Sequence, residues 1–323
     1  MEITIDQKYS NQRIDKFLSI KLQELGFKQA TRNMIKDHIP KGVRINNGEV
    51  KSSHKLKIGD TIVIDKEYWK DFFNKLDLSD HISPQKGELN ILFEDDYLLV
   101  LLKPKNLVVH PGVGNKENTL ANYIRYYLES KNQFDTNMDR AGIVHRLDKG
   151  VSGIIVVAKN KEVQDNLKKQ FSNREVKKIY LAEVEKFKEN ELNSTKNRNL
   201  DTVLKDIEDG NIDYSDWFKA QGFIGRDKVN RYRMKFKLYE FSGSKPAKSY
   251  ILPIGDNKLL IKIVTGRMHQ IRATLNYFGY NIKGDSLYKS KKETVSSENI
   301  MLKSIYLSFV HPVTKEKVTF LKV

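Results

Sequence analysis

The chain has 323 residues, of which 39% are hydrophobic and 30% charged, so it is long enough for about two domains and too apolar to be disordered throughout. Its 57 Lys and Arg residues against 41 Asp and Glu give a net charge of +16, which favours a partner with a negative surface, most often nucleic acid. The chain has no Cys, which excludes disulfides, thiolate metal sites and cysteine nucleophiles.

Residues 1–65 are predicted to form a small module of two helices followed by β-strands. Apolar residues recur at helical spacing over 11–26, with Ser10 in the position of an N-cap and Gly26 in the position of a stop. A second helix is predicted over about 29–38. Three basic residues spaced four apart would line one face of it, which suits contact with a polyanion: Lys28, Arg32 and Lys36.

The rest of the module reads as β-structure. Short β-like pieces flank Asn47-Gly48, a dipeptide that favours a hairpin turn. Residues 66–88 are polar with scattered aromatics and are interpreted as a linker.

From Leu89 to the last residue, 323, the chain is rich in β-like segments, and we expect one further domain of the α+β class. Strands without strict strand–helix–strand repetition favour a mixed sheet. Strands are predicted at 90–104, 153–159, 177–184 and 258–266, and helices at about 118–129, 161–173 and 268–278.

One stretch differs in charge from the rest of this domain. Residues 185–217 hold five basic and nine acidic residues, a net charge of −4, with few core-forming side chains before Trp217. We therefore predict a surface insertion over 185–222 that faces away from any polyanion.

A charged turn at 141–151 precedes the apolar strand predicted at 153–159. His145, Arg146 and Asp148 lie in this turn, and a charged cluster at the end of a buried strand is a favourable place for chemistry. On spacing alone, a structural ion pair between Arg146 and Asp148 is an equally good interpretation.

A second charged cluster lies at the start of the helix predicted at 268–278. Arg267, His269 and Arg272 crowd its first turn, where cations oppose the helix dipole. This arrangement indicates that they hold an anion, either a carboxylate or a phosphate; ordinary surface charge on a helix is the alternative.

Taken together, the motifs of this domain resemble one family, the RluA/RluD family of RNA pseudouridine synthases. They occur in the family's order: KPKNLVVHPG at 103–112, HRLDKGVSGIIVVAK at 145–159, the tyrosine of IYLAEV at 179–184, SKPAKSY at 244–250, and TGRMHQIR at 265–272 followed by GDSLY at 284–288. The resemblance covers about 89–184 and 223–323, and the combination of motifs is specific.

The resemblance implies a catalytic domain with a mixed, largely antiparallel sheet that isomerises uridine to pseudouridine without a cofactor or a metal. It implies that Asp148 is the essential carboxylate, that Arg267 lies beside it and lowers its pKa, and that Tyr180 lies against the uracil ring. Arg146 is implied to insert into the space that the flipped uridine leaves.

Residues 1–65 in turn resemble the ribosomal-protein-S-four-like RNA-binding domain. The matching segments are RIDKFL at 13–18, TRNMIK at 31–36 and KGVRINNGEVK at 41–51. The resemblance implies RNA contacts by five basic residues: Arg13, Arg32, Lys36, Lys41 and Arg44. The alternative is that these charges form only the solvated face of a helix.

The expected partner is structured RNA, most often large-subunit ribosomal RNA or its precursor particle, with transfer RNA as an alternative. A non-catalytic RNA-binding or ribosome-assembly protein on the same fold is a second alternative. A third is a metal-dependent nuclease that uses His145, Asp148, His269 and Asp285. The early acid in MEITIDQ and apolar runs far shorter than a membrane span predict a cytoplasmic protein without a membrane partner, which we expect to be a monomer.

Overall fold

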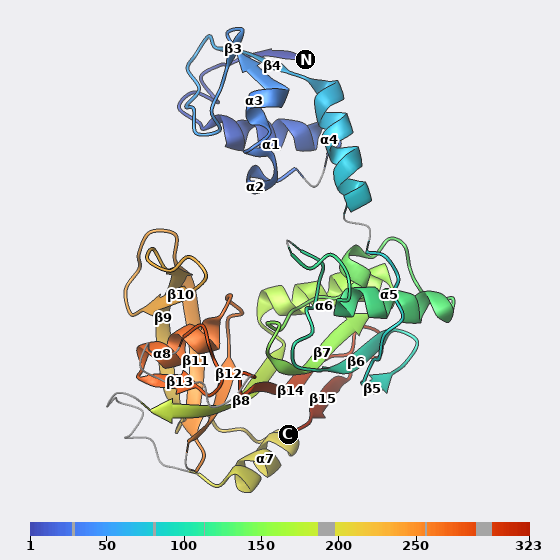
Figure 1. Ribbon diagram of the computed structural model, residues 1–323, viewed down its shortest axis with the longest axis vertical. Helices are drawn as coiled ribbons and strands as arrows, with labels where there is room; N and C mark the ends of the chain where they lie inside the picture. The colour runs from blue at the N-terminus through green and yellow to red at the C-terminus, as the bar shows by residue number, and fades with distance from the viewer. Residues whose placement is uncertain (28–29, 80–81, 113, 187–197, 256, 289–298) are drawn as a thin grey trace. The chain divides into compact units, whose positions relative to one another are not determined.

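The computed structural model describes residues 1–323 except 28–29, 80–81, 113, 187–197, 256 and 289–298 (Figure 1). The chain divides into two units, Met1–His81 and Ile82–Val323. Each unit has its own hydrophobic core. No helix in the described ranges is long and apolar enough to cross a membrane.

The first unit packs four helices against a small antiparallel sheet. The predicted order of helices followed by strands is present, but one strand precedes it and one helix follows it. The strands lie in the order β1 (Glu2–Thr4), β4 (Thr61–Ile64), β2 (Val43–Ile45) and β3 (Gly48–Glu49). The helices are α1 (Ile14–Glu24), α2 (Arg32–Ile35), α3 (Ile39–Gly42) and α4 (Lys66–Ser79).

Both predicted helices of this unit are shorter in the structure. The first starts at Ile14 with Arg13 at its N-cap, so Ser10 is not the cap, while Gly26 ends it with a φ of +99°. The second helix was predicted over 29–38, but α2 covers only Arg32–Ile35 of that range. A separate helix, α3, starts at Ile39. Pro40 lies in the first turn of α3, where its missing N–H costs no helical hydrogen bond. Lys28 lies outside the described residues.

The hairpin is confirmed, one residue earlier than predicted. Ile45 pairs with Gly48, so the two-residue loop is Asn46-Asn47, with φ values of +49° and +65°. Two positive φ angles are typical of a type I′ turn, which asparagine tolerates. Asn46 also accepts a hydrogen bond from the Thr61 N–H at 2.9 Å, which ties the turn to β4.

The linker predicted over 66–88 is wrong. Residues 66–79 form α4, whose Trp69 and Phe73 are buried in the core of the first unit. The Trp69 indole donates to the Gly42 carbonyl at 3.0 Å, and a Cβ at Gly42 would lie 2.6 Å from that indole nitrogen. Residues 82–83 instead belong to the second unit, since the Ile82 carbonyl accepts a hydrogen bond from Arg125 of α5 (Leu120–Ser130).

The second unit contains an 11-stranded, mixed and largely antiparallel sheet, which confirms the α+β class. Nine of its strands follow the order β10-β9-β11-β12-β8-β14-β7-β6-β5, with β13 beside β8 and β15 beside β14. Its strands are β5 (Ile91–Glu94), β6 (Leu98–Lys103), β7 (Ser152–Ala158), β8 (Lys177–Lys186), β9 (Phe218–Arg226), β10 (Met234–Lys237), β11 (Lys245–Pro253), β12 (Lys258–Ile263), β13 (Tyr280–Ile282), β14 (Leu302–Val310) and β15 (Lys317–Leu321).

Helices cover the two halves of this sheet separately (Figure 1). Helices α5 and α6 (Lys161–Asn173) pack on β6 and β7, while α8 (Gln270–Tyr277) packs on the half around β8, β11 and β12. Strand β14 joins the halves, because it pairs with β7 in parallel and with β8 antiparallel. The loop before β7 therefore lies at the junction of the halves.

The segment predicted as a surface insertion, 185–222, packs against the sheet for part of its described length. Its first residues continue β8 and its last ones begin β9, a strand inside the sheet. Between them, α7 (Leu200–Glu208) buries Val203 and Ile207 with Trp217 against the sheet face that carries Ile179. The segment thus closes a core despite its acidic exterior, and 187–197 lie outside the described residues.

Candidate active site

Close backbone contacts place the loop that carries Asp148. Gly153, at the start of β7, has a φ of +123°, and a Cβ there would lie 2.2 Å from the Ser304 carbonyl oxygen of β14. Only glycine allows β7 and β14 to approach this closely. The Asp148 carbonyl accepts a hydrogen bond from the Val151 N–H at 3.0 Å, which closes the turn just before β7.

A buried lysine, which the sequence analysis missed, anchors the same loop. The Lys103 side chain is fully buried, and its ammonium donates to the carbonyls of Pro104, Leu107 and Lys149 at 2.8, 2.8 and 3.2 Å. Burial lowers the pKa of Lys103 to about 8, against the opposing attraction of the Asp148 carboxylate. The sequence does carry a signal for this role: Lys103 directly follows the apolar run 98–102, which predicts a buried lysine. A buried ammonium needs several hydrogen-bond acceptors around it.

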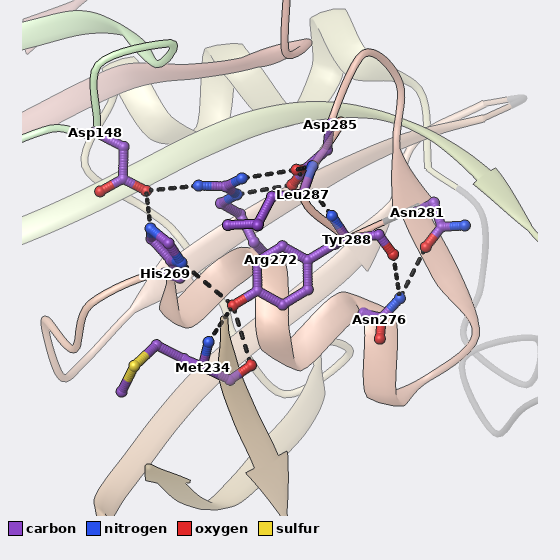
Figure 2. Close-up of polar contacts among 9 residues, drawn as sticks. All are labelled: Asp148, Met234, His269, Arg272, Asn276, Asn281, Asp285, Leu287 and Tyr288. Carbon is purple, nitrogen blue, oxygen red and sulfur yellow. Dashed lines mark hydrogen bonds and ion pairs between the residues drawn. The ribbon is translucent and has the colours of Figure 1, made fainter. Parts of the chain in front are cut away.

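Asp148 lies where Arg272 and His269 converge on one of its oxygens (Figure 2). Its Oδ2 is 3.4 Å from Nη1 of Arg272 and 3.8 Å from Nε2 of His269. The Asp148 side chain is 25% exposed, whereas those of Arg272 and His269 are 12% and 11% exposed. A carboxylate held this way presents its other oxygen to a ligand.

Arg272 is itself held by a second, buried carboxylate. Its Nε and Nη2 donate to the two oxygens of Asp285 at 2.7 Å each, a bidentate pair, and the Asp285 side chain is 1% exposed. Asp285 also accepts from the N–H groups of Leu287 and Tyr288, so its charge is well compensated. The anion predicted near the start of the 268–278 helix is thus a pair of carboxylates, both bound by Arg272.

The predicted pair between Arg267 and Asp148 is wrong. Arg267 donates from Nε to the Pro246 carbonyl at 3.0 Å, and no ion pair joins it to Asp148 within the described part of the chain. The helix begins only at Gln270, after His269 in a left-handed conformation, so the chain changes direction between the two arginines. That change turns Arg272, and not Arg267, toward Asp148.

Tyr180 lies in β8 on the face of the sheet that α8 covers. It packs in the same apolar cluster as Leu147 and Val151 of the Asp148 loop and is 6% exposed. Burial, together with the nearby Asp148 charge and against a Ser304 hydrogen bond, raises the pKa of Tyr180 well above its usual value. The structure therefore brings Tyr180 and Asp148 together, with the phenol protonated at neutral pH.

Arg146 is exposed beside this site and makes no ion pair with Asp148 among the residues that the structure describes. The structural alternative for the turn, an Arg146–Asp148 pair, is therefore not found. An exposed arginine that has no carboxylate partner in the described ranges is available to a ligand.

His145 has a structural role. Its Nε2 accepts the Val156 N–H of β7 at 3.0 Å, and its ring stacks on Phe171 with centroids 4.7 Å apart. Burial holds the pKa of His145 well below its usual value, so the ring is neutral in the folded protein.

Acidification is expected to destabilise the second unit through His145. The unfolded imidazole titrates at about 6.5, so below that pH the unfolded chain binds a proton that the folded chain does not. The free energy of unfolding should therefore fall as the pH decreases from about 6.5. In His145→Gln, which keeps an acceptor but does not titrate, denaturant unfolding at several pH values should show a flatter dependence; equal slopes would contradict this assignment.

The four residues of the metal-dependent nuclease alternative do not form a cluster. His145 faces Val156, and Asp285 is occupied by Arg272. Across the described ranges, no three His, Cys, Asp or Glu side chains come together as a metal-binding group.

The basic residues predicted in the first unit differ in their surroundings. Arg13 and Arg32 both bind Asp15, whose side chain is 6% exposed, and Arg44 donates to the Pro40 carbonyl. Lys36 and Lys41 are exposed, with no ion pair in the described part of this unit. The arginines thus support the fold of the unit while their side chains stay 42–48% exposed, and the two lysines are exposed without such contacts. RNA contact by all five residues stays a prediction.

Comparison with known proteins gives consistent matches. The sequence profile of the family described as RNA pseudouridylate synthase matches residues 97–277. The chain is 30% identical, over 299 residues covering 91% of it and 81% of the relative, to a protein of Borreliella burgdorferi named ribosomal large subunit pseudouridine synthase D. It is 31% identical over 250 residues to a protein of the same name from Zymomonas mobilis, covering 74% of this chain and 70% of that one.

A solved structure also shares the fold of this chain. It is named human RNA pseudouridylate synthase domain containing 1, and the superposition has a TM-score of 0.52 at 21% sequence identity. The match covers 74% of this chain and 86% of that one.

Proposed function

The chain belongs to the RNA pseudouridylate synthase family and is an isomerase of that type, and from this premise we propose that it modifies uridines of large-subunit ribosomal RNA with Asp148 as its catalytic carboxylate. The observation that carries the proposal is the Asp148 carboxylate, held on one oxygen by Arg272 and His269 within the cluster that includes Tyr180. Membership of an enzyme family favours this function over the non-catalytic alternative.

The reaction breaks the bond between the sugar and N1 of uracil, turns the base, and forms a new bond through C5. Asp148 serves it as an ionised carboxylate, by one of two routes: attack on the sugar carbon or removal of the 2′ proton. Arg272 holds the carboxylate in position on either route, because its Nη1 lies 3.4 Å from Oδ2 of Asp148. On the attack route, the bond from Asp148 to the sugar breaks as C5 bonds to that carbon; on the other route, the 2′ proton returns to the sugar. On both routes C5 loses its hydrogen and N1 gains one, so product and substrate have the same atoms.

Tyr180 and Arg146 act on the base in this proposal. Tyr180 offers a ring surface beside Asp148 and a hydroxyl that keeps its proton, so it donates a hydrogen bond and does not act as a phenolate. The uridine must leave its stack to reach the buried tyrosine. Arg146, exposed at the edge of the site, fills the vacated space by stacking its guanidinium on the neighbouring bases.

The ribosomal target rests on the names of relatives, since two of them are named ribosomal large subunit pseudouridine synthase D. The test is to map pseudouridine across all cellular RNA with and without this gene. We expect the loss of one or a few sites in large-subunit ribosomal RNA. Loss confined to transfer RNA would support the alternative substrate and contradict this one.

The first unit is proposed to bind RNA phosphates through Lys36 and Lys41. In Lys36→Gln and in Lys41→Gln, the slope of log affinity against log salt should decrease by about 0.7–0.9, the effect of one lost phosphate contact. The Michaelis constant should rise with little change in turnover number, because uniform binding is lost. Filter binding at several salt concentrations measures the slope.

The matched control for these variants is Lys205→Gln, which removes the charge of an exposed lysine from the acidic α7. We expect it to leave the salt dependence unchanged. Equal slopes in all three variants and the original protein would show that Lys36 and Lys41 do not contact the RNA backbone.

A further inference from the structure

Tyr288 joins three groups through its hydroxyl (Figure 2). The Met234 N–H of β10 donates to this oxygen at 2.7 Å, the Met234 carbonyl lies 3.0 Å from it, and Nδ1 of His269 lies 3.3 Å from it. A hydroxyl has one hydrogen to donate. That hydrogen goes either to the Met234 carbonyl or to His269.

The Asp148 carboxylate, on the opposite side of the His269 ring from Tyr288, favours one of the two ring nitrogens as the site of the hydrogen. Nε2 points to Oδ2 of Asp148 at 3.8 Å, and an ionised carboxylate only accepts hydrogen bonds. Burial lowers the pKa of His269, against the attraction of Asp148, so the ring is neutral and has a single N–H. The favourable tautomer carries this hydrogen on Nε2, which leaves Nδ1 as an acceptor.

The charged and titratable groups around His269 agree with this tautomer. Asp148 and Asp285 attract a proton to the ring, whereas Arg272 and Arg146 oppose a second one. Burial raises the pKa of Tyr288 to about 12, so its hydroxyl keeps a hydrogen to donate to Nδ1.

The Tyr288 hydroxyl is also fixed in place. The Tyr288 side chain is buried, and the backbone N–H of Tyr288 donates to the Asp285 carboxylate. The guanidinium carbon of Arg272 lies 5.1 Å from the centre of the Tyr288 ring. The strand β10 contact holds the far end of the side chain. A fixed donor of this kind sets which nitrogen of the neighbouring imidazole carries the hydrogen.

We propose that Tyr288 is a positioning residue that donates to Nδ1 of His269 and fixes its N–H on Nε2, so that His269 and Arg272 hold the same oxygen of Asp148. The inference rests on the proposed catalytic role of Asp148. With the other tautomer, the Nε2 lone pair faces the carboxylate and repels it from its position.

A double-mutant cycle tests the proposal. Tyr288→Phe removes only the hydroxyl, and we expect the turnover number to fall by about tenfold to a hundredfold, the loss typical of orienting partners, with the Michaelis constant within about twofold. In His269→Gln, the amide donates to Asp148 without a choice of tautomer. Adding Tyr288→Phe to that variant should therefore cost less than about twofold.

Tyr127→Phe is the matched control, because it removes a hydroxyl that donates to Glu94 on α5's side of the sheet. It should keep full activity. If Tyr288→Phe costs the same factor in the original protein and in His269→Gln, Tyr288 acts by holding β10 and the proposal is wrong.

The tautomer itself is measured by nitrogen NMR of the histidine-labelled protein. His269 should show a protonated Nε2 in the original protein and a smaller share of this tautomer in Tyr288→Phe, because Nδ1 then loses its donor while Asp148 still faces Nε2. An unchanged tautomer would overturn the proposal. This readout does not depend on turnover, so it separates a failure here from a failure of the catalytic role of Asp148.

Discussion

Asp148→Asn is expected to abolish pseudouridine formation, with a loss of about 10⁴-fold or more, the scale seen when an essential nucleophile or base is removed. The substitution keeps the shape of the side chain and removes its charge. An amide neither attacks a sugar carbon nor abstracts a proton at neutral pH. The measurement is the pseudouridine formed in ribosomal RNA by purified protein under single-turnover conditions.

The fold should survive this change. Asp148 lies in a loop with its side chain 25% exposed, and Arg272 keeps its bidentate pair with Asp285. We therefore expect an unchanged melting temperature and nearly unchanged RNA affinity in Asp148→Asn. Turnover at a sizeable fraction of the original rate would rule out Asp148 as the catalytic carboxylate.

Arg272→Met is expected to lose activity and stability together. Removing one member of a buried pair leaves the other charge uncompensated and costs about 3–5 kcal/mol. Here the stranded charge is Asp285, whose side chain is 1% exposed, and Asp148 loses its nearest cation. Denaturant unfolding and turnover measure the two losses, and Arg272→Lys should recover little activity because an ammonium lacks the guanidinium fork.

Two matched variants separate these effects. Arg272→Met with Asp285→Asn removes both charges of the buried pair, so it should regain much of the stability without activity. Arg267→Met removes a guanidinium whose one side-chain hydrogen bond among the described contacts is to the Pro246 carbonyl, and we expect a smaller loss of activity and no large loss of stability. A greater loss of activity in Arg267→Met than in Arg272→Met would restore the pairing predicted from the sequence.

Local patterns in the sequence were sufficient for several elements. The apolar runs predicted as strands became β6 and β7, because a strand buried on both faces needs apolar side chains at every position. The helix predicted over 161–173 was confirmed as α6, with the Asn160 side chain accepting the Val163 N–H at its start. Signals of this kind act over a few residues and need no knowledge of the rest of the chain.

Other assignments failed because a distant segment decides them. The aromatic residues Trp69 and Phe73 are buried only because the fold packs α4 into the core of the first unit. The hydrogen-bond partner of the Trp69 indole, the Gly42 carbonyl, lies 27 positions earlier in the chain. The same holds for Val203 and Ile207 of the acidic segment, which find their apolar surface on β8, β11 and β12. The composition of such a helix is dominated by its polar, solvent-facing residues, so composition alone does not reveal the few apolar residues that are buried.

The candidate site shows the same division. The sequence by itself determined the family, the Asp148 turn and the presence of an arginine cluster that binds an anion, because these depend on residue types in order. Only the tertiary structure decided which arginine serves Asp148, since the two partners are 124 positions apart and the choice depends on where α8 begins. Starting at Gln270, the helix turns Arg272 toward Asp148 and leaves the Arg267 side chain bound to the Pro246 carbonyl. No local pattern distinguishes two arginines five residues apart before that start is known.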